Sequence, residues 1–366
     1  MANGPLTLDK ISSDIARDGL SWEPRESEYT RLSEAEQIKR LGLIVTPQEM
    51  QRLSAERDRF ALQEKTLLTA MVGAPAAVDW RNKGGNWVTP VKDQGGCGSC
   101  VSFCSCSTIE SAVRIKLGNP SYAIDLSEGF LQFCGGGSCG GWGLTSGLDF
   151  AKSTGVTDEA CMPYVATDMN CAASRCANWA TRLTKIKSYT GYASMDARKN
   201  AIATLGPVLA GMAVYTDFGF SGANVYRKTS TATLRGYHCI CVVGYDDAQQ
   251  CWILKNSWGA SWADNGYVKV GYGQADLLID TSWSFYSVVP DIQAGWLNNV
   301  VVGQVYASRD SQNAWAHISG YGWRRIQTGS ADGVRNMLML LATASAEGKR
   351  ATVYADGDFL YQAYML

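Results

Sequence analysis

The stretch Gln94-Gly95-Gly96-Cys97-Gly98-Ser99-Cys100 decides how the rest of the chain is interpreted. It is a glycine-rich turn that leads directly into residues 100–116, whose apolar spacing is helical. Cys100 is therefore expected at a helix N-terminus, where partial positive charge and free backbone N–H groups favour a thiolate. Such a thiolate is a candidate nucleophile. The Cys100 N–H and the Gln94 side chain are candidate donors to an oxyanion.

A thiolate nucleophile needs a base and a group that orients the base. The chain has only two histidines. His238 begins an apolar pattern typical of a strand, whereas His317 lies in a separate terminal segment and is expected to be structural. Asn256, within Lys255-Asn256-Ser257-Trp258-Gly259, is the candidate partner of the imidazole, and Trp258 would shield that hydrogen bond from water.

A set of motifs in fixed order resembles the papain family of cysteine peptidases. It runs from Val78-Asp79-Trp80 to Phe285-Tyr286, and includes Pro90 to Gln94, Cys97 to Cys100, Leu126-Ser127-Glu128, Cys139-Gly140-Gly141, Pro163-Tyr164, His238 and Asn256 to Gly259. The histidine and the asparagine follow Cys100 by 138 and 156 residues, close to the roughly 130–150 given for this family. The resemblance implies an α+β, papain-like fold in two domains. A helical left half carries Cys100, a β-barrel-like right half carries His238 and Asn256, and the cleft lies between them.

The resemblance also implies a function. The chain would be a cysteine endopeptidase that hydrolyses peptide bonds through a thioester acyl-enzyme, with no metal or organic cofactor, and would be made as an inactive proenzyme. Cys100 would be the nucleophile, His238 the acid and base, Asn256 the orienting residue and Gln94 part of the oxyanion hole. The residues expected to contact substrate are Gly98, Ser99, Gly140, Gly141, Trp142, Gly143, Gly211, Gly236, Cys239, Trp258 and Trp283.

Twelve cysteines lie between Cys97 and Cys251, and the flanking segments have none. This clustering predicts one disulfide-bearing domain and an oxidising compartment, hence a secreted or periplasmic protein, although the first residues lack the basic and apolar regions of a secretory signal. The resemblance implies the pairs Cys97–Cys139 and Cys134–Cys171. Whether Cys161 pairs with Cys176 stays open. Free thiols are expected to be buried on the helix (Cys104, Cys106) and in the strands (Cys239, Cys241, Cys251).

Three segments follow from the charge and apolar patterns. Residues 1–74 are predicted to be a charged helical pro-segment that inhibits the enzyme until it is cleaved near residues 73–77. Thr46-Pro47-Gln48-Glu49 is a capping box that starts an amphipathic helix, and a shorter helix is expected over residues 33–41. Residues 75–290 would be the peptidase, in which antiparallel strands begin at residue 238. Residues 291–366 would be a small β-rich accessory domain.

The terminal segment shows three strand patterns, a helix and two further strands. The expected ranges are 298–306, 313–318, 321–327, a helix from Ser330 or Asp332 to about residue 346, then 351–355 and 359–365, with Asp356-Gly357 as a hairpin turn. This order suits a small OB-like barrel, a fold that binds oligosaccharides or nucleic acids. Carbohydrate or protein is the expected partner. Trp296, Trp315, Tyr321 and Trp323 would either stack on sugar rings or form the core.

Several other classes are disfavoured. The net charge of -1 and pI near 6.2 give no support for nucleic acid or an anionic membrane as partner, and no apolar run approaches the roughly 20 residues that cross a bilayer. A redox pair or half a zinc site at Cys97-x-x-Cys100 lacks a second ligand pair of suitable spacing. The remaining alternative is a papain-like binding protein without activity. Val101 and Tyr237 depart from the residues that usually flank the family's nucleophile and histidine.

Overall fold

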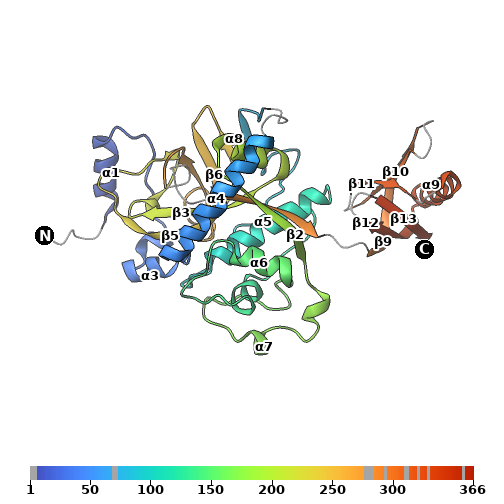
Figure 1. Cartoon of the computed structure of the whole chain (residues 1–366), viewed down its shortest axis with the longest axis horizontal. Helices are drawn as coiled ribbons and strands as arrows, with labels where there is room; N and C mark the ends of the chain where they lie inside the picture. Colours follow the sequence, from blue (N-terminus) through green and yellow to red (C-terminus); the bar gives the residue numbers. More distant parts are fainter. Residues whose placement is uncertain are drawn as a thin grey trace. The chain divides into compact units, whose positions relative to one another are not determined.

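The computed structural model describes residues 6–67, 73–275, 284–291, 295–308, 313–319, 322–327, 330–356 and 359–366 (Figure 1). Trp283, Tyr321 and Gly357, which the sequence singled out, lie outside the described residues, as does the side chain of Trp296. The chain divides into two compact units, residues 1–112 with 124–289, and residues 113–123 with 290–366.

The N-terminal segment is helical, as expected. Its helices are α1 (Leu8–Arg17), α2 (Glu28–Arg31), α3 (Glu34–Lys39) and α4 (Pro47–Leu67). Polar side chains cap each start: Ser27 and Ser33 form capping boxes, and the Thr46 hydroxyl accepts from the Glu49 N–H at 3.1 Å. Helix α4 crosses the first unit and packs on strand β2 (Figure 1).

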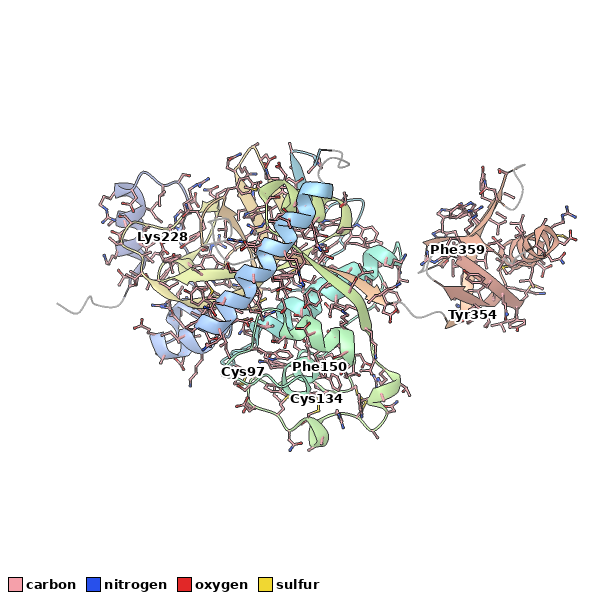
Figure 2. The ribbon with its side chains drawn as sticks, viewed as in Figure 1. Cys97, Cys134, Phe150, Lys228, Tyr354 and Phe359 are labelled. Atoms are coloured by element: carbon pink, nitrogen blue, oxygen red, sulfur yellow. A yellow bond between two sulfur atoms is a disulfide. The ribbon has the colours of Figure 1, made fainter. Side chains whose placement is uncertain are left out.

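The helical half of the first unit is built around α5 (Cys100–Lys116). Its first fourteen residues are all buried, which explains why small and apolar side chains occur all round this helix. Around it lie η2 (Phe130–Cys134), α6 (Ser146–Ser153), α7 (Cys171–Ser174) and η3 (Trp179–Thr181). Disulfides join Cys97 to Cys139, Cys134 to Cys171 and Cys161 to Cys176, and Figure 2 labels Cys97, Cys134 and Phe150 of α6.

The β half is one sheet in the order β2-β8-β3-β5-β6-β7-β4, with β1 paired to β5. The strands are β1 (Ala77–Asp79), β2 (Lys185–Tyr192), β3 (Val208–Tyr215), β4 (Val225–Tyr226), β5 (Leu234–Asp246), β6 (Cys251–Lys255), β7 (Tyr267–Gly271) and β8 (Phe285–Asp291). Helix α8 (Met195–Leu205) and η4 (Phe218–Phe220) lie between strands along the chain. In the register of β3 and β5, Met212 pairs with His238 and Gly211 with Cys239.

Three details of the β half differ from the sequence prediction. Strands β1, β2 and β3 all precede residue 238, where strands were expected to begin. Strand β3 escapes the prediction because it is a continuous buried apolar run that periodicity cannot distinguish from a buried helix. His238 lies inside β5, not at its start, since Leu234, Gly236 and Tyr237 also pair with β3. The sheet is not wholly antiparallel, because β4 pairs with β7 in parallel.

The terminal unit contains a closed barrel in the strand order β10-β11-β13-β12-β9. Its elements are β9 (Gly295–Ala307), β10 (Ala314–Ile318), β11 (Gly322–Ile326), α9 (Ala331–Ala346), β12 (Arg350–Asp356) and β13 (Phe359–Met365). The predicted sequence of three strands, a helix and two strands is confirmed. Strand β11 pairs with β13 in parallel, and the whole arrangement is OB-like. Figure 2 labels Tyr354 and Phe359 on β12 and β13.

The core of this barrel is made of small and branched apolar side chains, among them Ala316, Ile318, Leu341, Val353 and Leu360, all of which are fully buried. Across the described ranges, none of the helices has both the length and the apolar character that a bilayer span requires.

Candidate active site

Cys100 is the first residue of α5 and is fully buried. Its Sγ accepts a hydrogen bond from the Cys239 N–H at 3.4 Å. Cys239 follows His238 in β5, so the thiol lies beside the strand that carries the candidate base. Burial raises the pKa of Cys100 to about 12, which keeps the thiol protonated despite its position at a helix N-terminus.

The imidazole of His238 is held by Asn256. Nε2 of the histidine lies 2.8 Å from Oδ1 of Asn256, and the same oxygen accepts from the Ser257 N–H at 2.8 Å. The bond from the Ser257 N–H identifies this Asn256 atom as the amide oxygen, which can only accept. Nε2 of His238 therefore carries the proton, and Nδ1 of the neutral ring is the basic nitrogen. Within the described residues Nδ1 has no hydrogen-bond partner. Burial lowers the pKa of His238 to about 4, although the bond to Asn256 favours the protonated ring.

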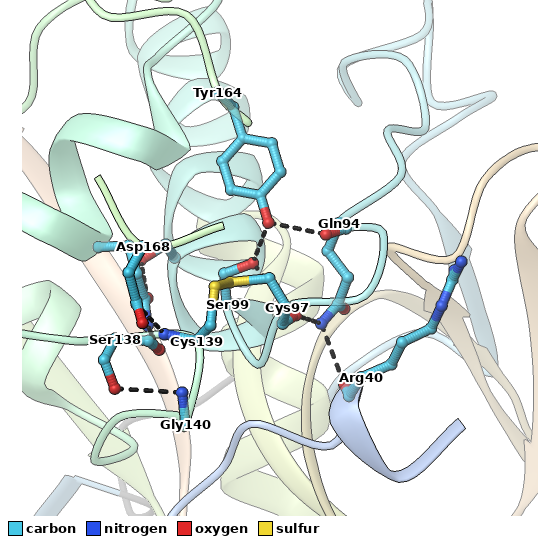
Figure 3. The surroundings of a disulfide bond; sticks show 11 residues. Arg40, Gln94, Cys97, Ser99, Ser138, Cys139, Gly140, Tyr164 and Asp168 are labelled. Atoms are coloured by element: carbon cyan, nitrogen blue, oxygen red, sulfur yellow. Dashed lines mark hydrogen bonds between the residues drawn. A yellow bond between two sulfur atoms is a disulfide. The ribbon is translucent and has the colours of Figure 1, made fainter. Parts of the chain in front are cut away.

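Gln94 is fixed by several hydrogen bonds, and those to Tyr164, Cys97 and Arg40 are drawn in Figure 3. Its Nε2 donates to the Cys97 carbonyl at 2.8 Å and to the Arg40 carbonyl at 3.0 Å, and its Oε1 accepts from the Ser257 hydroxyl at 2.6 Å. The Tyr164 hydroxyl donates to the Gln94 carbonyl at 2.7 Å. One of the two carbonyl oxygens that accept from this amide, that of Arg40, therefore belongs to the N-terminal segment.

Residues 41–44 of the N-terminal segment pass between Trp142 and Tyr237, where the substrate cleft is expected, and form an isolated β-bridge at Leu43. The Trp142 N–H donates to the Gly42 carbonyl at 2.8 Å, and the Ile44 N–H donates to the Trp142 carbonyl at 2.9 Å. On the other wall, the Leu43 N–H donates to the Tyr237 carbonyl at 3.3 Å. Main-chain bonds to both walls are how an extended peptide would be held.

Gly42 is the closest point of this approach. A Cβ added to Gly42 would stand 1.8 Å from the Gly98 carbonyl oxygen, and one added to Gly141 would stand 2.4 Å from the Gly42 carbonyl oxygen. Only glycine at residue 42 permits the segment to lie this close to the turn before Cys100.

Tyr29 of α2 covers the face of Trp258, the residue next to the His238 ring. Its ring stacks on Trp258 with centroids 4.0 Å apart and planes inclined by 5°, and Trp258 in turn lies 5.0 Å from the His238 ring. Both aromatic side chains are 2% exposed. The surface of Trp258 is thus closed by the N-terminal segment.

Two helices fasten the segment at its ends. Asp14 of α1 accepts from the Thr231 hydroxyl at 2.6 Å, and Asp18, the C-cap residue of α1, accepts from the Ser230 N–H at 2.5 Å. These bonds hold the pKa of both carboxyls below the ordinary value.

Helix α4 makes the second attachment. Glu64 accepts from the Ala193 N–H at 2.6 Å and from the Ser194 N–H at 3.2 Å, and the Phe60 ring fills the space that a side chain at Gly191 would need.

The residues expected to contact substrate fall into two groups. Gly98, Gly141, Trp142 and Gly236 contact the segment in the cleft, Trp258 lies under Tyr29, and Gly143 lies near Glu49. By contrast, Ser99 is fully buried and its hydroxyl meets the Tyr164 hydroxyl at 2.7 Å, so it supports the turn from inside. Gly140 bonds to Ser138, while Gly211 and Cys239 form a buried strand pair.

Sequence reasoning missed two side chains of the site. Ser257 and Tyr164 both hold Gln94, and each lies in a motif quoted for the resemblance without a role assigned to it. Their hydroxyl groups were the available signal, but only the fold brings them to Gln94.

Comparison with known proteins gives a consistent family. Residues 74–286 match the papain family of cysteine proteases. The chain is 36% identical over 203 residues to cathepsin K of Gallus gallus, covering 53% of this chain and 58% of that protein. It is 34% identical over 214 residues to cysteine proteinase 1 of Entamoeba histolytica, covering 54% of this chain and 64% of that protein. The chain thus spans less than two thirds of the length of these relatives.

Solved structures of proenzymes share the fold. Procathepsin L2 from the larval midgut of Tenebrio molitor superposes with a TM-score of 0.62 at 25% identity, over 76% of this chain and 88% of that one. Procathepsin B S9 of Trypanosoma congolense gives 0.63 at 18% identity, over 79% of this chain and all of that one, and this likeness concerns the fold alone. The expected papain-like α+β fold, preceded by a helical segment, is confirmed.

Proposed function

This chain belongs to the papain family of cysteine proteases, and we propose that it is a cysteine endopeptidase kept as an inactive proenzyme by residues 1–74. The observation that carries the proposal is the Arg40 carbonyl on Gln94 Nε2. A carbonyl of the chain's own N-terminal segment takes the acceptor position that the carbonyl of a substrate would need during hydrolysis.

The proposed reaction uses Cys100, His238, Asn256 and Gln94. Nδ1 of His238 takes the proton of the Cys100 thiol, the resulting thiolate attacks the scissile carbonyl carbon, and the oxyanion accepts from the Cys100 N–H and from Gln94 Nε2. His238 gives its proton to the departing amine, which leaves a thioester on Cys100. The imidazole then takes a proton from water, the water attacks the thioester, and the acid product leaves as the thiol reforms. Asn256 keeps the ring in the required tautomer.

Inhibition by the segment has an electrostatic component besides the steric one. While residues 1–74 cover the cleft, burial raises the pKa of Cys100 to about 12 and lowers that of His238 to about 4. Both groups are then neutral at ordinary pH. Removal of the segment admits water. Water lowers the free-energy cost of charging both groups, so the Cys100 thiolate and the His238 imidazolium become the favoured forms. We expect cleavage near residues 73–77, after α4 and no further than the first residue of β1.

The cleft favours apolar side chains in the pocket for the second residue before the scissile bond. Leu41 of the N-terminal segment packs on Gly236, where an added Cβ would stand 3.0 Å from its Cδ1. Trp142 and Gly143, which are also expected in the pocket, are likewise uncharged. An arginine there would lose water without gaining a partner, so aliphatic and aromatic residues should be preferred in a peptide library.

The three disulfides support an oxidising compartment, hence a secreted or periplasmic protein. A test is the redox state of the protein isolated from its native source. Fully reduced Cys97, Cys134 and Cys161 would contradict this assignment.

The decisive experiment compares the intact chain with a shortened chain and with two variants of the shortened chain. A chain beginning at Ala77 should hydrolyse a fluorogenic dipeptide at least about a hundredfold faster than the intact chain, because the cleft is open. Cys100→Ala in the short chain should abolish turnover, whereas Cys106→Ala, which removes another fully buried thiol of α5, should not. Activity in Cys100→Ala would refute the mechanism. A short chain that stays inactive and does not react with an epoxide directed at Cys100 would indicate the binding-protein alternative.

A further inference from the structure

Aromatic side chains lie side by side on the outer surface of β9, β10 and β11. The cross-strand rows are Tyr306–Trp315–Arg325 and Gln304–His317–Trp323. The residues that alternate with them in β10, namely Ala314, Ala316 and Ile318, are buried in the barrel. Because successive side chains of a strand point to opposite faces, both rows are on the outside. We call this surface the outer aromatic face.

The outer aromatic face is hollowed. An open depression of about 730 Å³ is bordered by both tryptophans, Tyr306, Gln304 and, from α9, Ser345. Tyr306 is 54% exposed and Trp323 is 43% exposed. Gly303 leaves space at the base of the depression, because a Cβ there would stand 3.2 Å from Nδ1 of His317. This volume lies within the roughly 300–1,000 Å³ of typical ligand sites.

The rings are held in place before any ligand arrives. Nε1 of Trp315 donates to Oδ1 of Asn313 at 2.9 Å, and the Trp323 and His317 rings meet edge to face with centroids 5.5 Å apart. The Ser345 hydroxyl, which donates to the Gly303 carbonyl at 3.1 Å, ties α9 to the same floor. Rings that are already ordered cost little entropy on binding.

The chemistry of the face selects a ligand class. Exposed indole and phenol rings offer flat apolar surfaces that match the C–H faces of pyranose rings, and Gln304, His317 and Arg325 offer planar polar groups for hydroxyls. Arg325 is the one permanently charged side chain of the two rows, and residues 291–366 contain six basic and six acidic residues. A polyanion needs several cations along its path. We propose that the outer aromatic face binds neutral oligosaccharides.

Binding is tested with the full chain carrying Cys100→Ala, so that no self-cleavage occurs. Cellohexaose, chitohexaose and maltohexaose are titrated in turn by calorimetry, with the oligonucleotide dT12 as the polyanion. We expect at least one hexaose to bind and dT12 to bind more weakly than that sugar. Trp323→Ala should weaken the affinity by about tenfold or more, as expected for loss of one stacked ring.

Two further variants separate stacking from folding. Trp323→Tyr keeps a ring and should recover most of the affinity. Tyr364→Ala removes an exposed ring from β13, outside the two rows, and should leave the affinity unchanged. The proposal fails if none of the three hexaoses binds, if dT12 binds more tightly than every sugar, or if Trp323→Ala, with its circular dichroism unchanged, binds the sugar as well as the parent chain.

Discussion

The carbonyl oxygen of Arg40 accepts a hydrogen bond of 3.0 Å from the side-chain amide of Gln94, 54 residues further along the chain. The same amide is held from behind by the Ser257 hydroxyl and by its bond to the Cys97 carbonyl. These bonds fix the orientation of the Gln94 amide. A substrate carbonyl that took the place of the Arg40 carbonyl would therefore accept from the same nitrogen. The Gln94 amide thus donates to the N-terminal segment in the inhibited state and would donate to the oxyanion in the proposed reaction.

Gln94→Ala should therefore slow the proposed reaction once the segment is removed. In a chain that begins at Ala77, loss of one oxyanion donor should lower kcat by about 10²–10³-fold with little change in KM. Steady-state kinetics on a fluorogenic peptide measure this. Gln249→Ala, at an exposed position, is the control and should be neutral. An increase in KM with kcat unchanged would show that Gln94 contributes only to substrate binding.

Gly42→Ala should weaken inhibition in the intact chain. The new methyl group would stand 1.8 Å from a backbone oxygen of Gly98, which no side-chain rotation relieves, so the segment must move away from the turn. Hydrolysis of a small peptide by the intact chain, measured before processing, should rise at least about tenfold. Gly73→Ala, where an added Cβ meets nothing within 4 Å, serves as the matched control. Equal activities of the two variants would contradict this account of the segment.

Tyr29→Ala should loosen the segment over the histidine. Removing a buried ring of this size costs about 3 kcal/mol, which corresponds to roughly a hundredfold more frequent opening. Hydrogen–deuterium exchange of residues 28–44 should accelerate by that factor. Tyr29→Phe keeps the ring that stacks on Trp258, so it should exchange nearly as the parent chain does. Fast exchange in Tyr29→Phe as well would assign the effect to the hydroxyl instead.

Acid should release α1 before α4. The pKa values of Asp14 and Asp18 lie below the ordinary 3.8 because Thr231 and Ser230 donate to the carboxylates. Their ionised forms therefore stabilise the attached helix at any pH above about 3.8, and this contribution is lost as the pH falls through the lower folded-state values. Glu56 of α4 behaves in the opposite sense. Burial raises its pKa, so its protonation in acid favours the attached state.

Hydrogen exchange of residues 8–17 should accordingly increase as the pH is lowered below about 4, after correction for intrinsic rates, while residues 47–64 stay protected. In the Asp14→Asn, Asp18→Asn double variant, residues 8–17 should exchange rapidly at neutral pH too, with no further step in acid. If the variant kept the acid step of the parent chain, other groups would have to control the attachment of α1.

Local patterns in the sequence predicted much of this architecture. Helix α5 starts at Cys100 and ends at Lys116 as its spacing indicated, because a glycine turn and a 3.6-residue period act within a few residues of one another. The three strands, helix and two strands of residues 295–365 were identified for the same reason. The order of the motifs was enough to identify the family.

Contacts between distant residues were decided by the tertiary structure alone. Strand β3 was not recognised, because its apolar run becomes a strand only through pairing with β5 on one side and β8 on the other. Nothing near Gly42 in the sequence indicates that it lies against Gly98, or that Arg40 faces Gln94. Helices α1 and α4, one at each end of the segment, bind the β half. Their attachment fixes the position of the residues between them, which lie across the cleft. A single sequence records which residues have the right chemistry, whereas the long-range packing of the folded chain determines which of them meet.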